Sequence, residues 1–214
     1  PPFGNAFFAA MKPVSIPLAL AAVLSGPVAF AQLARPEAPP SLEPSSHGGS
    51  GYGVARDGER LVAAGAHYAA AFDHTGVEFT PALGERVPHA TPLAFRLTSI
   101  HRGQETIYTP PIGGVAPRLD GDLVHFDRGA IRETYAIASN GIEQSFLFDA
   151  VPAGAGDLVV RGEIETPLVF AGAHAASNGV HFTLGGPGGD ASGVFFGGVT
   201  GIDADGNRAT GTIR

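Results

Sequence analysis

The sequence predicts an all-β fold, an antiparallel β-sandwich-like domain that follows a signal peptide and a Pro/Gly-rich linker. Short apolar or alternating runs recur after Tyr52, and glycine, proline, asparagine and aspartate separate them, as in strands joined by turns. No stretch has convincing helical periodicity, and no repeat of fixed period indicates a propeller or a solenoid.

Residues 11–31 are predicted to be a secretory signal peptide. Lys12 supplies the charged region, Leu18–Leu24 the apolar region, and Ala29 and Ala31 the small residues at positions −3 and −1 before the cleavage site. A membrane anchor or a buried helix is the alternative. Prolines and a glycine interrupt the run, however, whereas a spanning helix needs about 20 apolar residues.

The remaining chain divides by composition. Residues 1–10 precede the single methionine and are predicted to be a non-native upstream extension. Residues 32–50 are rich in proline, glycine and serine and are predicted to be a disordered linker. Residues 51–214 form the predicted β-rich domain. Its last strand has barely begun at Arg214, so we expect the domain to be truncated at its C-terminus.

The first predicted strands form a hairpin. His67–Phe72 and Val77–Thr80 flank the turn at 73–76. Farther along the chain, Leu93, Phe95 and Leu97 are predicted to point to one side of a strand and Arg96 and Thr98 to the other, as a half-buried strand requires.

The clearest predicted unit is a second hairpin between residues 131 and 148. Ile131, Tyr135 and Ile137 share one face of its first strand, and Ser139-Asn140-Gly141 supplies a turn that accepts positive φ. The residues that return on the inner face of its second strand are Ile142, Phe146 and Phe148.

Four further strands complete the predicted domain. Leu158, Val160 and Ile164 alternate with Val159, Arg161, Glu163 and Glu165 on one strand, which gives it one polar side. Val180, Phe182 and Leu184 form an inward set on the next strand. The last two predicted strands are 194–202 and 209–213, on either side of the turn at 203–207.

Charge and cysteine content limit the function classes. The chain has 13 basic and 20 acidic residues and a net charge of −7, which argues against binding nucleic acid or anionic lipid. The absence of cysteine excludes disulfides, thiolate metal sites and a cysteine nucleophile. We expect a secreted, periplasmic or cell-surface protein with no stable membrane insertion after signal cleavage.

Three groups of carboxylates are candidate sites. Asp203-Ala204-Asp205-Gly206-Asn207 resembles a calcium loop in its alternating oxygen ligands, but it lacks the glycine at position 6 and the glutamate at position 12, which favours a hairpin turn. Glu163 and Glu165 share a strand face and suggest a glycoside hydrolase, yet that face is predicted to be solvated. Glu133 falls on an inner face and needs a partner, which Arg161 or Arg128 could provide.

The other chemistry-bearing residues form no recognised motif. The eight histidines lack the close same-face pairs of zinc sites, and no Gly-x-Ser-x-Gly nucleophile elbow occurs. The glycine-rich run 185–189 lacks the lysine and the helix of a phosphate loop. We therefore assign no catalytic, cofactor-binding or metal-binding residue, and no cofactor.

Residues 135–166 carry a resemblance. Gly-Ile-Glu-Gln-Ser-Phe at 141–146, a Pro-x-Gly-x-Gly turn at 152–156 and a Leu-Val-Val strand at 158–160 resemble the N-terminal β-rich region of large secreted or surface bacterial proteins. Repeats, often propeller-forming, commonly follow that region. The resemblance implies a non-catalytic module of an extracellular assembly and carries over no functional residues.

The sequence thus favours an exported structural or binding module of a larger extracellular or surface protein. Two alternatives remain open: a carbohydrate-active hydrolase that uses surface carboxylates, and a calcium-stabilised adhesin-like domain. Partners, ligand and oligomeric state are not predicted.

Overall fold

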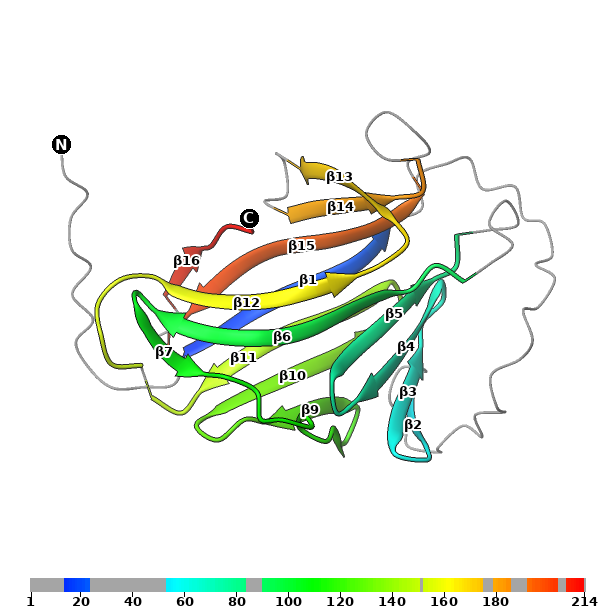
Figure 1. Ribbon diagram of the computed structural model, residues 1–214. Helices are drawn as coiled ribbons and strands as arrows, with labels where there is room; N and C mark the ends of the chain where they lie inside the picture. The colour runs from blue at the N-terminus through cyan, green and yellow to red at the C-terminus, as the bar shows by residue number, and fades with distance from the viewer. Residues whose placement is uncertain are drawn as a thin grey trace.

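A computed structural model describes residues 14–23, 53–83, 90–150, 152–174, 179–185, 192–203 and 207–213. Within these residues the chain forms sixteen strands in two antiparallel sheets and no helix, which confirms the predicted all-β fold (Figure 1). The predictions for residues 1–10 and 32–50 lie outside the described residues.

The first sheet has nine strands in the order β13-β14-β15-β1-β11-β10-β9-β8, with β16 paired to β15. Their bounds are β1 Val14–Val23, β8 Arg118–Asp120, β9 Leu123–Asp127, β10 Ile131–Ala138, β11 Gly141–Phe148, β13 Val169–His174, β14 Gly179–Thr183, β15 Gly193–Ile202 and β16 Arg208–Thr210.

The second sheet has seven strands in the order β12-β6-β5-β4-β3-β2, with β7 paired to β6. Their bounds are β2 Val54–Asp57, β3 Arg60–Ala64, β4 Tyr68–Asp73, β5 Gly76–Pro81, β6 Leu93–Arg102, β7 Glu105–Tyr108 and β12 Leu158–Glu165.

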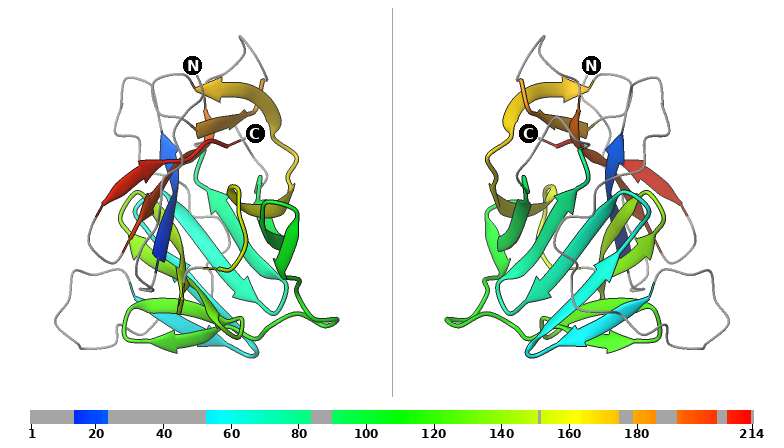
Figure 2. Two further views of the ribbon diagram at one scale, coloured as in Figure 1. Left: turned by 90° about the vertical axis from the view of Figure 1, so that its left-hand side faces the viewer. Right: turned by 90° about the vertical axis from the view of Figure 1, so that its right-hand side faces the viewer.

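The two sheets pack face to face around one core (Figures 1 and 2). Aromatic pairs join them: the rings of Phe72 on β4 and Tyr135 on β10 lie 5.2 Å apart, and those of Phe95 on β6 and Phe196 on β15 lie 5.8 Å apart. Alternation explains why these residues point inward, since every second side chain of a strand faces the same side of its sheet.

The predicted hairpins are confirmed. β4 and β5 pair across the turn at 73–76, and β10 and β11 pair from Ile131 opposite Phe148 to Ala138 opposite Gly141. On β6, Leu93, Phe95 and Leu97 are all buried. Sequence periodicity was sufficient here because each strand has one apolar face.

Two strands differ in detail from the prediction. β12 is only half-buried on its apolar side, and its register shifts between Arg161 and Gly162, where a side chain on the glycine would collide with the Phe95 ring. On β14, Thr183 alternates with the predicted inward set of Val180, Phe182 and Leu184, yet it is buried as well, at 4% exposure.

The largest difference concerns the predicted signal peptide. Val14–Val23, within that segment, forms β1 in the middle of the first sheet, antiparallel to both β11 and β15. This strand is not among those predicted from the sequence. The rest of the segment, 11–13 and 24–31, lies outside the described residues.

Candidate functional site

The inner face of β10 carries a charged residue into the core. Glu133 is 1% exposed and lies between the buried Ile131 and Tyr135 on one face of the strand, as the alternation predicted. Of the two partners predicted for it, the structure selects Arg128. Arg161 lies instead on the exposed side of β12.

Both carboxylate oxygens of Glu133 accept hydrogen bonds. Oε2 accepts from Nε of Arg128 at 2.7 Å and also from Nη2 of the same guanidinium. Oε1 accepts from the Tyr135 hydroxyl at 2.7 Å and from Nε2 of Gln144 at 2.5 Å. We call these four residues, Arg128, Glu133, Tyr135 and Gln144, the Glu133 cluster.

The arginine of the cluster is held on both sides. Nη1 of Arg128 donates to the Tyr108 hydroxyl at 3.1 Å, and the guanidinium lies 5.5 Å from the Tyr108 ring and 5.1 Å from the Phe126 ring. Burial alone lowers the pKa of Arg128, but the charge of Glu133 and the hydrogen bonds to Tyr108 and Glu133 outweigh it, so the pKa is raised. Arg128 therefore remains a buried cation.

The tyrosine of the cluster is held as a hydrogen-bond donor. Complete burial, followed by the adjacent negative charge of Glu133, raises the pKa of Tyr135 well above its usual 10.0. Its hydroxyl also accepts a hydrogen bond of 2.8 Å from Gln144. The cluster is satisfied and closed to solvent, and it ties the end of β9 to β10 and β11.

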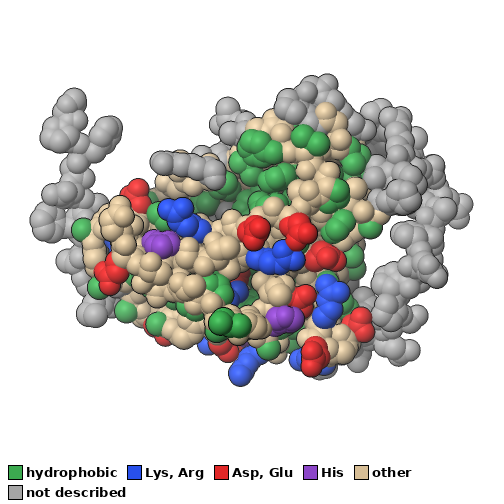
Figure 3. Space-filling model, in the orientation of Figure 1, with side chains coloured by type: hydrophobic (Ala, Val, Ile, Leu, Met, Phe, Trp, Pro, Cys, Tyr) green, Lys and Arg blue, Asp and Glu red, His purple; other side chains and the backbone are tan. Residues whose placement is uncertain are grey.

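The outer face of the second sheet carries ion pairs between neighbouring strands. Nη1 of Arg96 on β6 donates to Oε2 of Glu165 on β12 at 2.6 Å, and Arg60 on β3 lies 4.0 Å from Glu78 on β5. Acidic and basic side chains intermix over this face in Figure 3. The hydrogen bond that Arg96 donates to Glu165, ahead of other contributions, raises the pKa of Arg96.

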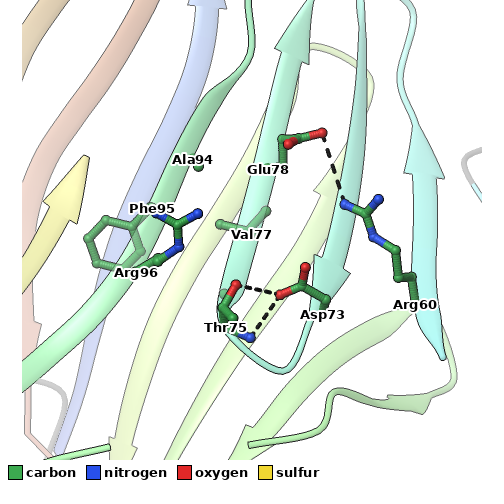
Figure 4. Close-up of a pocket in the computed structure, with 9 residues that line it drawn as sticks. Arg60, Asp73, Thr75, Val77, Glu78, Ala94, Phe95 and Arg96 are labelled. Carbon is green, nitrogen blue, oxygen red and sulfur yellow. Dashed lines mark hydrogen bonds and ion pairs between the residues drawn. The ribbon is translucent and has the colours of Figure 1, made fainter. Parts of the chain in front are cut away.

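Two hollows adjoin on this face. The first, shown in Figure 4, includes Arg60, Asp73, Thr75 and Glu78 in its lining and has a volume of ≈ 30 Å³. Such a volume holds roughly one or two water molecules and no sugar ring. The second has a volume of ≈ 400 Å³ and is lined by Glu78, Arg96 and Glu165, together with small and apolar residues. Two carboxylates therefore face one shallow, open depression.

The turn beside the first hollow is ordered by a side chain. Oδ1 of Asp73 accepts hydrogen bonds from the backbone N–H of Thr75 at 2.8 Å and from its hydroxyl at 2.6 Å. Burial raises the pKa of Asp73, but these hydrogen bonds and the charge of Arg60 lower it by more than burial raises it. The pKa of Asp73 is therefore lowered overall. Asp73 thus stabilises the hairpin as a carboxylate.

A serine–histidine pair also lies on the outer face of the second sheet. Oγ of Ser99 is 2.8 Å from Nε2 of His101, and Nδ1 of His101 is 3.3 Å from Oγ1 of Thr106. In a hydrolytic triad a carboxylate faces the second ring nitrogen and stabilises the imidazolium. Here a neutral hydroxyl occupies that place. The pair was not predicted from the sequence, because the only serine motif considered was the Gly-x-Ser-x-Gly nucleophile elbow. The signal that could have identified it is that Ser99 and His101 lie two residues apart on one strand.

The candidate carboxylates Glu133, Glu163 and Glu165, and a fourth acidic residue, Glu143, do not converge on one place. Glu133 lies in the core, whereas Glu163 and Glu165 lie on the exposed face of β12. Glu143 is exposed on β11 of the other sheet. Of these four, only Glu165 faces a hollow, and the carboxylate that joins it there is Glu78, which sequence reasoning did not select.

The predicted turn at 203–207 uses its first aspartate locally. Oδ1 of Asp203 accepts from the backbone N–H of Asn207 and Oδ2 accepts from its side-chain amide, both at 2.8 Å. These bonds favour the turn interpretation over a calcium loop for the two described residues; 204–206 lie outside the description. Within the described ranges no three His, Asp or Glu side chains are grouped closely enough to hold a metal ion.

His125 is the most buried histidine among those described. It lies on β9 at 9% exposure, with Nε2 4.0 Å from Oδ2 of Asp120. In the described chain its Nδ1 has no hydrogen-bond partner. No further ligand-type side chain joins it there.

In the part of the chain that the structure describes, no helix has the length and hydrophobicity that a membrane crossing requires. No protein-family model, curated protein or solved structure matches this chain.

Proposed function

We propose that this chain is an exported, non-catalytic structural or binding module of a larger extracellular or surface protein. The observation that carries the proposal is the Glu133 cluster. Glu133, which alternation places in the core, is hydrogen-bonded at both carboxylate oxygens and is 1% exposed, so it serves packing and not a substrate.

The export half of the proposal rests on residues 11–31 and is tested by processing. The full chain with a C-terminal tag is expressed in a bacterium, the cells are fractionated, and the mass of the exported product is measured. We expect cleavage after Ala31. Ala31→Phe should block cleavage by enlarging position −1, and the matched control Ala34→Phe, beyond the site, should leave it unchanged. An unprocessed cytoplasmic product of the parent chain would contradict export.

A second candidate, a carbohydrate-active hydrolase, is favoured by one observation: Glu78 and Glu165 line the same hollow, with Arg96 beside them. Paired carboxylates are the machinery of glycoside hydrolysis. We expect the purified full chain to release no reducing sugar from soluble polysaccharides. Turnover that Glu165→Gln abolishes without lowering the melting temperature, and that Glu143→Gln leaves intact, would overturn the non-catalytic proposal.

A further inference from the structure

The strand β1 lies in the first sheet between two strands that are far from it in the sequence. Val14–Val23 pairs with β11 from Val14 opposite Phe148 to Ala21 opposite Gly141, and on its other side with β15. In Figure 1 it is the blue strand inside the sheet. The next strand among the described residues, β2, begins at Val54 and belongs to the other sheet. Pairing with β11 and β15 therefore joins β1 to the domain, and the sequence between β1 and β2 is rich in proline and glycine.

The chemistry of this place is defined by the two flanking strands. Ile142 on β11 and Phe196 on β15, both buried, are the register partners of Leu20 on its two sides. The next inward positions of β11 are buried as well: Gln144, Phe146 and Phe148. By contrast, Ala19 is the register partner of the exposed Glu143. The place thus selects an extended segment with apolar residues at alternate positions and tolerates polar ones between them.

Without β1, the strands β11 and β15 are too far apart, where they stand, to form backbone hydrogen bonds with each other. Both are antiparallel to β1, so they run parallel to each other across two strand spacings, roughly 9.6 Å. Each would present a row of unpaired N–H and C=O groups beside buried side chains. Such an edge is a template for an added strand.

We propose that, once Val14–Val23 has been removed, the place between β11 and β15 binds an extended apolar strand donated by another polypeptide. The proposal rests on the proposed export, because cleavage after Ala31 is what would remove β1. We call this place the acceptor groove. The donor pairs antiparallel with both flanking strands and places an apolar side chain in the row of Ile142 and Phe196.

The test uses the full chain, folded with β1 in place and then cut at a protease site inserted between residues 32 and 50. The probe is a fluorescent synthetic peptide of residues 14–23 carrying a solubilising lysine tail. We expect the peptide to displace the cut N-terminal fragment and to bind saturably by fluorescence anisotropy. A cut protein that releases its fragment, keeps its far-UV spectrum and cooperative melting, and binds no peptide would overturn the proposal.

Two peptide variants test the alternation. Leu20→Lys places a charge at the position whose register partners are the buried Ile142 and Phe196, and it should weaken binding by about tenfold or more. Ala19→Lys, the matched control, places the same charge opposite the exposed Glu143 and should bind within about threefold of the parent peptide. Equal weakening by the two variants would show that binding is non-specific and would overturn the proposal.

Register is tested by cross-linking, which the absence of native cysteine makes specific. A peptide with Ala19→Cys should form a disulfide with the Glu143→Cys protein, since directly opposed Cβ atoms lie about 4.5–5.5 Å apart. It should not cross-link the control protein Arg161→Cys, whose cysteine lies on the other sheet. Equal cross-linking of both proteins would overturn the proposal.

Failure of export and failure of the acceptor groove are distinguishable. An exported product that keeps residues 11–31 contradicts the proposed processing, whereas peptide binding to the protein cut in vitro decides the groove independently.

Discussion

Replacing Glu133 by glutamine should destabilise the protein more than any other single charge removal described here. The substitution keeps the shape of the side chain and removes its charge. The Arg128 guanidinium, whose side chain is 4% exposed, then remains as a buried cation without its counter-ion. The hydrogen-bond donors of Tyr135 and Gln144 also face a weaker acceptor.

The magnitude follows from burial. Glu133 and Arg128 have side-chain exposures of 1% and 4%, so solvent screens their attraction very little. Breaking a buried pair by removing one partner costs about 3–5 kcal/mol. With an urea m-value of about 2 kcal/mol/M, this loss lowers the unfolding midpoint by about 2 M.

Urea unfolding followed by circular dichroism measures the effect. The matched control is Glu143→Gln, an exposed carboxylate on the neighbouring strand, which should change stability by less than about 0.5 kcal/mol. Because a total stability of about 5–15 kcal/mol leaves little margin, Tyr135→Phe provides a milder variant. It removes one hydroxyl from the cluster and should cost about 1–3 kcal/mol.

A double substitution isolates the charge effect. Glu133→Gln combined with Arg128→Met removes the cation that the single variant leaves unpaired, so most of the lost stability should return. A cost below about 1 kcal/mol for Glu133→Gln, or no recovery in the double variant, would refute the claim that an uncompensated buried charge sets the penalty.

Three further predictions concern turns. Gly113→Ala and Gly114→Ala both place a side chain at positive φ, but of these two positions only Gly114 brings the added Cβ against a backbone atom, the carbonyl oxygen of His74. Thermal melting should show that Gly113→Ala lowers the free energy of unfolding by about 1 kcal/mol and that Gly114→Ala lowers it by about 1–3 kcal/mol more. Equal losses would contradict this prediction. Thr75→Val should cost about 0.5–1 kcal/mol at pH 7. Because the pKa of Asp73 lies below its usual 3.8 when folded, this difference should vanish as the pH falls through the folded pKa, and a difference that persists in acid would refute the role of its charge. A chelator should leave the melting midpoint unchanged, because the aspartate after β15 already accepts hydrogen bonds within its turn; a lowered midpoint would support the calcium hypothesis.

The sequence was informative wherever one face of a strand is apolar. Alternation predicted the hairpin of β10 and β11, the buried side of β6 and the inward position of Glu133. It could not predict the completed cluster. Gln144 lies eleven residues from Glu133 and meets it only through the hairpin register, and Arg128 was one of two candidates.

The outer-face site depended even more on the tertiary structure. Glu78, Arg96 and Glu165 come from three strands, two of them adjacent in the sheet only because β12 returns to β6. Sequence reasoning selected Glu163 with Glu165 because they are neighbours in one strand. It had no means of identifying which strand lies beside which.

By itself, then, the sequence determined that the chain is built of antiparallel strands and which residues of the alternating strands are buried. Only the tertiary structure decided the partner of Glu133, the residues that line the outer hollows and the place of Val14–Val23. The physical reason is that alternation of apolar and polar residues shows which face of a strand is buried, whereas a mainly apolar run does not distinguish the two faces. The run at 14–23 fits a signal peptide as well as a central strand, and pairing with β11 and β15 is a long-range contact that local pattern does not encode.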